Sequence, residues 1–201
     1  MEKNISVSIL NLNEKEIPKF LEKYKNCSEK INELEIKSKC FKNIVHFDVM
    51  DNKFVPNNGI DIKYIKTVKN IGLYADTHLM VENPIGDKYV DNAIEYGTDD
   101  LTIHYEIKNF EAVLKYLNER KEKLKKEKNR DLVIGVSVKP NTNIKDLLKY
   151  KEKFSKLLIM SVEPGFGGQQ YIESVNEKIK EARKLFKNHI IQVDGGINLN
   201  T

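Results

Sequence analysis

"NIVHFDVMDNKFVPN", residues 43–57, decides the fold because its first half alternates between an apolar face and a polar face. In a β-strand, residues two apart share a face. One face is wholly apolar and suits packing against helices: Val45, Phe47 and Val49. The other carries His46 and Asp48, and an unpaired charge inside a buried strand costs several kcal/mol, in order of magnitude. We therefore expect the polar face to point into the interior of a barrel, where other strands supply partners.

Similar apolar runs recur along the chain and predict a series of parallel strands. Seven runs rich in Val, Ile and Leu begin at Ile5, Asn43, Gly72, Asp100, Asp131, Lys156 and His189. Between them lie charged segments with helical periodicity, clearest at residues 13–24, 110–126 and 174–186. Strands and helices that alternate every 25 to 40 residues, roughly, are typical of successive βαβ units. An open doubly wound sheet and a closed barrel both fit this order.

The residues at the ends of the strands favour the barrel. Polar or glycine residues follow six of the seven runs: Asp48, His78, His104, Lys139, Gly167 with Gly168, and Asp194 with Gly195 and Gly196. A barrel builds its site from loops after many strands, whereas an open sheet concentrates it at one switch point. We predict an α/β fold of the TIM (β/α)8-barrel type. Because we count only seven strands, we expect the last βα unit, about 25 residues long, to be lacking from the given chain.

Composition narrows the class of protein. The chain has 201 residues, 40% hydrophobic residues and a formal net charge of +4 from 34 basic and 30 acidic side chains. Such an interleaved surface does not suit nucleic acid, although phosphorylated metabolites remain possible partners. Cys27 and Cys40 fall in one charged stretch, which makes a disulfide improbable. We find no signal peptide and no apolar run of membrane-spanning length, and we expect a cytoplasmic protein.

Residues with metal-binding side chains share faces on three of the expected strands. His46 lies with Asp48, His78 lies with Asp76, and Asp194 lies with Gln192. Two imidazoles and two carboxylates that converge at the mouth suit a divalent ion such as Zn, Mn, Fe or Co. Taken singly, each residue has a structural alternative: a histidine is more often a hydrogen-bonded core residue, and an aspartate can cap a helix. The methionines at 50, 80 and 160 can equally be core filler.

Two glycine motifs predict a site for a phosphate group. "SVEPGFGGQQYI", residues 161–172, follows one strand, and "VDGGIN", residues 193–198, follows the next. Backbone N–H groups in such loops can bind an anion without a charged side chain, and barrels tend to hold phosphate at the loops after the last strands. The glycines can alternatively serve only to make turns.

Six segments together resemble the ribulose-phosphate 3-epimerase family over essentially the whole chain. They are "VSIL", "VHFDVMDNKFVPN", "DTHLMVENP", "TIHYE", "IMSVEPGFGGQQYI" and "QVDGGIN". The resemblance implies one ribulose-phosphate-binding TIM-barrel domain over residues 1–201, C-terminally incomplete, and a homo-oligomer. It implies one divalent metal ion (Zn, Fe, Mn or Co) held by His46, Asp48, His78 and Asp194. The substrate-binding residues it implies are Ser8, Met50, Met80, Met160, Gly165, Phe166, Gly167, Gly168, Gly195 and Gly196.

The activity implied by this resemblance is the interconversion of D-ribulose 5-phosphate and D-xylulose 5-phosphate in the pentose phosphate pathway. Inversion at C3 requires proton removal on one face of the carbon and proton return on the other, so Asp48 and Asp194 are the expected pair of catalytic acids and bases, acting through a cis-enediolate. An epimerase of another ketose phosphate and a non-catalytic phosphosugar-binding relative are the alternatives. Asn52 replaces a glycine usual in the family, and asparagine tolerates the left-handed conformation expected there. His104 and Glu106 share a face and can form either a second layer around the metal or a purely structural pair.

Overall fold

The computed structural model describes residues 4–33 and 43–201. Within these residues seven strands form one parallel sheet in chain order. The strands are β1 (Ser6–Ser8), β2 (Ile44–Met50), β3 (Tyr74–Met80), β4 (Asp100–His104), β5 (Val133–Val138), β6 (Lys156–Met160) and β7 (Ile190–Asp194). Parallel neighbours need a crossover connection, and helices supply it. The helices are α1 (Ile17–Glu33), α2 (Tyr64–Asn70), α3 (Tyr89–Tyr96), α4 (Phe110–Lys128), the 3₁₀-helix η1 (Ile144–Lys153) and α5 (Val175–Leu185).

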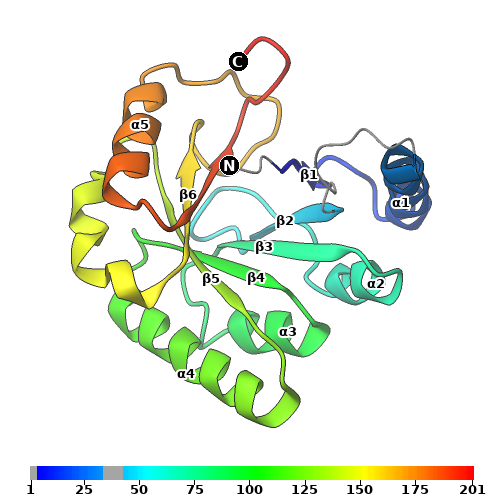
Figure 1. Cartoon of the computed structure of the whole chain (residues 1–201), viewed down its shortest axis with the longest axis horizontal. Coiled ribbons are helices and arrows are strands. Elements are labelled where there is room, and N and C mark those ends of the chain that lie inside the picture. Colours follow the sequence, from blue (N-terminus) through cyan, green and yellow to red (C-terminus); the bar gives the residue numbers. More distant parts are fainter. Residues whose placement is uncertain (1–3, 34–42) are drawn as a thin grey trace.

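The sheet curls strongly, with helices on its outer side (Figure 1). Four strands separate β2 from β7 in the sheet, yet side chains from both contact the same two histidines. Only a curled sheet brings such distant strands together. The arrangement confirms the predicted TIM-barrel type, and β1 and β7 form the two edges of the described sheet.

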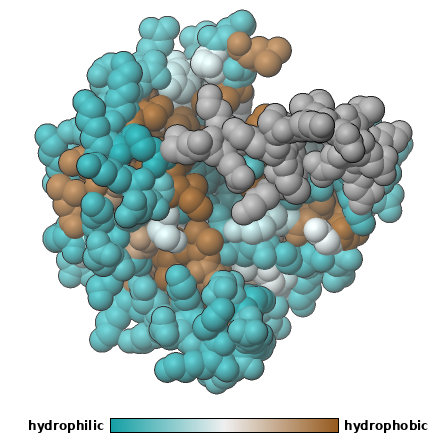
Figure 2. Space-filling view, in the orientation of Figure 1, coloured by the Kyte–Doolittle hydropathy of each residue, from teal (hydrophilic) through white to brown (hydrophobic). Residues whose placement is uncertain are grey.

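The alternation predicted for residues 44–50 is present in the structure. Val45 and Phe47 are fully buried and belong to the main hydrophobic core, which also contains residues of the surrounding helices. The register pairs His46 with Asp76 and Asp48 with His78 across β2 and β3. Parallel strands in this register place their polar side chains at matching levels inside the barrel. Hydrophilic residues cover most of the face in Figure 2, and hydrophobic residues gather toward its middle.

Several element boundaries differ from those predicted. The first strand covers only Ser6–Ser8 of the apolar run that begins at Ile5. The helix predicted over residues 13–24 begins at Ile17, with Pro18 in its first turn, where the lack of an N–H has little cost. The charged run after residue 118 continues α4 to Lys128. The backbone leaves the helix at Asn129 in a left-handed conformation (φ 47°), which asparagine tolerates.

Two other sequence predictions concern cysteines and membranes. Cys27 is an exposed free cysteine, and Cys40 lies outside the described residues, within the segment 34–42. In the part of the chain that the structure describes, every helix is too short or too polar to cross a bilayer.

Candidate metal and phosphate site

A cavity of about 1110 Å³ opens at the C-terminal ends of the strands and extends along the interior beside β1 and β7. His46, Asp48 and Asp194 line it, and His78 lies buried behind them. Every residue that sequence analysis predicted to contact substrate also lines the cavity: Ser8, Met50, Met80, Met160, Gly165, Phe166, Gly167, Gly168, Gly195 and Gly196. The fold thus collects residues from β1, β2, β3, β6 and β7 around one space.

The four predicted metal ligands form one compact cluster. One potential ligand atom from each of His46, Asp48, His78 and Asp194 lies within 4.8 Å of all the others. Oδ1 of Asp48 lies 3.3 Å from Nε2 of His46 and 3.4 Å from Nδ1 of His78. Oδ2 of Asp194 lies 3.7 Å and 3.9 Å from the same two nitrogens. Both carboxylates therefore face both imidazoles, as ligands of one ion would.

The two imidazole nitrogens that face the cluster are buried and lack hydrogen-bond partners among residues 4–33 and 43–201. The side chains of His46 and His78 are only 3% and 0% exposed. Buried polar atoms nearly always have partners, so an orphaned pair aimed at two carboxylates requires an explanation. A divalent ion with nitrogen and oxygen ligands supplies one, and the donor set fits Zn, Mn, Fe or Co. The cluster can thus hold a metal ion.

The two carboxylates differ in their electrostatic surroundings. Burial alone raises the pKa of Asp48, but the charge of His46 and the close approach of the two imidazoles outweigh it and hold the pKa below its usual value. Burial and the nearby negative charge of Asp48 raise the pKa of Asp194. The pKa values of Asp48 and Asp194 are thus shifted in opposite directions, which suits a pair of groups that act as base and acid.

A buried ion pair orients the ring of His46. Nδ1 of His46 donates to Oδ2 of Asp76 over 2.8 Å, which leaves Nε2 facing the cluster. The same carboxylate accepts hydrogen bonds from Lys156 and, over 2.7 Å, from the amide of Gln192. Lys156 also reaches Oδ2 of Asp100 at 3.2 Å. Sequence analysis placed Asp76 on the inward face but assigned it no role, and it missed Lys156, whose position at the start of an apolar strand was the available signal.

His78 is oriented from the opposite side by a second histidine. Nε2 of His78 lies 2.9 Å from Nε2 of His104, and Nδ1 of His104 lies 3.0 Å from Oε2 of Glu106. Burial lowers the pKa of both rings, which are therefore neutral near pH 7. Hydrogen bonding from His104 and from the backbone N–H of Lys139 outweighs burial and lowers the pKa of Glu106 to about 2.

Among the other predicted residues, Ser8 contacts one of the carboxylates, and the three methionines line the cavity. Ser8 donates a hydrogen bond of 2.8 Å to Oδ2 of Asp48, so it touches a predicted catalytic group directly. Met50 and Met80 pack with Val55 in one small apolar cluster. Met160 packs in another cluster, with Leu158 and Val162. All three methionines are buried and present thioether side chains to the cavity.

Hydrogen bonds hold the two glycine loops in place beside the cavity. The hydroxyl of Ser161 donates to the carbonyl oxygens of Asp194 (2.9 Å) and Gly195 (2.6 Å), which ties the turn after β7 to the end of β6. The amide of Gln169 donates to the carbonyl oxygens of Glu163 and Phe166, which closes the loop after β6. Asn52 adopts the left-handed conformation expected from its sequence (φ 55°).

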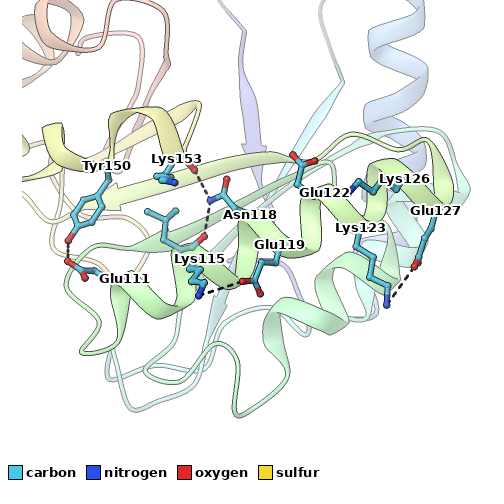
Figure 3. Close-up of a pocket in the computed structure, with 11 residues that line it drawn as sticks. Glu111, Lys115, Asn118, Glu119, Glu122, Lys123, Lys126, Glu127, Tyr150 and Lys153 are labelled. Atoms are coloured by element: carbon cyan, nitrogen blue, oxygen red, sulfur yellow. Dashed lines mark hydrogen bonds and ion pairs between the residues drawn. The ribbon is translucent and has the colours of Figure 1, made fainter.

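A second depression of about 710 Å³ lies on the outer surface between α4 and η1 (Figure 3). Its charged side chains are largely paired within the groove: Lys115 with Glu119, Lys123 with Glu127, and Tyr150 with Glu111. Such exposed pairs contribute about 0 to 1 kcal/mol to stability, and the groove does not contain the buried cluster of histidines and carboxylates found in the interior cavity. The groove therefore does not compete with the interior cavity as a functional site.

Comparisons with known proteins match the chain to one family. The family model described as "Ribulose-phosphate 3 epimerase family" matches residues 17–201. A protein of Oryza sativa subsp. japonica named "Ribulose-phosphate 3-epimerase, cytoplasmic isoform" is 33% identical over 163 residues, 78% of this chain and 66% of its own length. A Bacillus subtilis protein named "Ribulose-phosphate 3-epimerase" is 33% identical over 176 residues, 85% of this chain and 76% of its own length.

A further relative and a solved structure extend these matches. The Schizosaccharomyces pombe "Ribulose-phosphate 3-epimerase" is 31% identical over 161 residues, and the aligned chain spans 66% of its length, slightly under two thirds, as for the rice protein. The structure titled "QR15, an Aldolase" matches 96% of this chain and 80% of its own with a TM-score of 0.56 and 17% identity. At that identity the structural match indicates a shared fold alone.

Proposed function

Because this chain belongs to the ribulose-phosphate 3-epimerase family, we propose that it is an isomerase that interconverts D-ribulose 5-phosphate and D-xylulose 5-phosphate. One observation carries the proposal: two orphaned buried imidazole nitrogens and two carboxylates converge within 4.8 Å at the mouth of the barrel. The cavity beside them has room for a sugar phosphate of five carbons.

In this proposal His46, Asp48, His78 and Asp194 hold one divalent ion, Zn, Fe, Mn or Co. When bound, the ion supplies Lewis-acid stabilisation for the negative charge that develops on the oxygens of the cis-enediolate. Asp48 and Asp194 also carry the chemistry at C3. One carboxylate removes the proton from one face of the carbon, and the other acid returns a proton to the opposite face. A single base would tend to restore the starting isomer.

The other cavity residues bind and orient the substrate. Ser8 holds Asp48 by a hydrogen bond and lies where it can also meet a substrate hydroxyl. Met50, Met80 and Met160 exclude water from the reacting carbons, which strengthens every electrostatic interaction in the site. The loops that contain Gly165 to Gly168, with Phe166, and the turn of Gly195 and Gly196 bind the phosphate through backbone N–H groups.

We further propose that the protein acts in the pentose phosphate pathway in the cytoplasm, as a homo-oligomer. The name of the rice relative, a cytoplasmic isoform, supports the location. Size-exclusion chromatography with light scattering tests the oligomeric state, and a mass equal to that of one chain contradicts it.

Deuterium exchange tests the assigned chemistry. In D₂O, the purified protein with Mn²⁺ or Zn²⁺ should incorporate deuterium at C3 of ribulose 5-phosphate, and Asp48→Asn or Asp194→Asn should abolish the exchange. Asp131→Asn is the matched control, because Asp131 is exposed and pairs with Lys125 far from the cluster. Exchange at the wild-type rate in either site variant contradicts the roles. Ribulose 5-phosphate and a six-carbon ketose phosphate are assayed side by side. Turnover of the six-carbon compound alone would identify that compound as the substrate class instead.

A further inference from the structure

The hydrogen-bonded chain from His78 through His104 to Glu106 is not used by the proposed reaction. Both rings are fully buried, and the two Nε2 atoms lie 2.9 Å apart. Nδ1 of His104 lies 3.0 Å from a carboxylate oxygen of Glu106. Nδ1 of His78, at the other end of the chain, is the orphaned atom that faces Asp48 and Asp194.

The carboxylate determines the direction of every hydrogen bond in this chain. An ionised carboxylate can only accept, so Nδ1 of His104 carries the proton and donates to Glu106. A neutral imidazole with a proton on Nδ1 has a lone pair on Nε2, so His104 accepts at that atom. Nε2 of His78 must therefore be the donor, and Nδ1 of His78 keeps its lone pair. The opposite order would set a lone pair of His104 against the carboxylate.

We propose that Glu106, acting through His104, holds His78 in the tautomer that presents a lone pair at Nδ1 to the metal cluster. Glu106 and His104 are positioning residues in this scheme, and the inference rests on the proposed metal site. Metal ligation requires such a lone pair, and a hydrogen bond to the other ring nitrogen commonly fixes it. The carboxylate of Glu106 acts on His78 through the ring of His104, whereas the carboxylate of Asp76 contacts His46 directly.

The surroundings of Glu106 keep the hydrogen-bonded chain of His78, His104 and Glu106 rigid. The second carboxylate oxygen accepts hydrogen bonds from the backbone N–H of Lys139, at 2.7 Å, and from the hydroxyl of Thr142. The ring of Phe54 packs on His104 with centroids 4.7 Å apart. The carboxylate and the ring of His104 therefore each have a second contact that restricts rotation out of the chain.

Nitrogen-15 NMR of the full chain, before and after loading with Zn²⁺, tests the tautomer directly. The chelator-treated wild type should show His78 protonated at Nε2 and unprotonated at Nδ1, and Zn²⁺ should shift only Nδ1. A proton on Nδ1 of His78 in the wild type overturns the inference without any variant. If the wild-type protein binds neither Zn²⁺ nor Co²⁺, the proposed function is contradicted. The tautomer of His78 in the metal-free protein still tests whether Glu106 and His104 set its protonation.

Glu106→Gln separates a positioning role from a structural one, because a carboxamide can donate or accept and no longer imposes a direction. We expect a mixture of His78 tautomers and a loss of about tenfold or more in Co²⁺ affinity, the usual effect of removing a partner of a metal ligand. Glu111→Gln makes the same substitution at an exposed site outside this chain of hydrogen bonds. It should leave tautomer and affinity unchanged. A folded Glu106→Gln with one His78 tautomer and wild-type affinity overturns the proposal.

Discussion

The side-chain amide of Asn57 donates a hydrogen bond of 2.6 Å to the carbonyl oxygen of Gly165. The two residues are 108 positions apart, and the bond joins the loop after β2 to the glycine loop after β6. A methyl group added to Gly165 would lie 3.3 Å from the side chain of Val55 and 3.7 Å from that of Pro56. The loop that follows β2, which carries the proposed metal ligands His46 and Asp48, is thus fastened to the loop proposed to hold phosphate.

Asn57→Ala should loosen this connection and weaken substrate binding more than catalysis. Loss of one neutral hydrogen bond is worth about 1 kcal/mol, or roughly fivefold in KM, with kcat changed less. Steady-state kinetics with ribulose 5-phosphate measures both constants. Asn58→Ala is the control, because Asn58 is exposed and adjacent. Equal KM values for the two variants would show that the connection does not affect binding.

Lys156→Met should destabilise the protein strongly. The side chain of Lys156 is 2% exposed, and its ammonium group lies between Asp76 and Asp100. The substitution therefore leaves two buried carboxylates without their shared cation. Breaking a buried pair from one side typically costs about 3–5 kcal/mol. Urea denaturation measures the change in the free energy of unfolding. Lys108→Met, which removes an ammonium that is 85% exposed beside Glu82, should cost less than about 1 kcal/mol. A similar small loss for Lys156→Met contradicts the prediction.

The contribution of Glu106 to stability should disappear in acid. Its pKa is lowered to about 2 in the folded protein from 4.5, so the folded state favours the ionised form. The stabilisation is fully present above about pH 4.5 and is lost as the pH falls through 2, with an upper bound of roughly 3 kcal/mol. The difference in unfolding free energy between wild type and Glu106→Gln should therefore narrow from pH 6 to pH 2.5. A difference that is constant with pH contradicts this.

Gly196→Ala should disturb the proposed phosphate loop, whereas Gly168→Ala should be tolerated better. Both glycines have positive φ values, 65° and 75°, so alanine at either costs about 1–2 kcal/mol of strain. A methyl group on Gly196 would also lie 2.6 Å from the backbone nitrogen of Tyr171, whereas nothing lies within 4 Å at Gly168. Denaturation and calorimetric titration with inorganic phosphate should show the larger loss of stability and affinity for Gly196→Ala.

Much of the fold and the site follows from local patterns in the sequence. Alternation along residues 44–50 assigned His46 and Asp48 to one face, because side chains in any strand alternate with a period of two. The alternation of apolar runs with amphipathic segments predicted a parallel sheet, since parallel strands need helical crossovers, and the polar and glycine residues after six of the seven runs favoured a barrel. Glycine-rich segments after the last strands marked the loops beside the cavity. These features need only neighbouring residues, and a sequence displays them directly.

Tertiary structure alone decided which distant side chains meet. Lys156 and Asp76 are 80 residues apart, and the pairing of Asp48 with His78 depends on the register of two strands. Register and curvature are set by packing both faces of the whole sheet, which no local segment encodes. Likewise, the sequence left His104 and Glu106 open between two roles. The structure sets His104 against the far side of His78: the register of β3 and β4 pairs His78 with Thr102, and His104 lies two residues further along on the same face of β4.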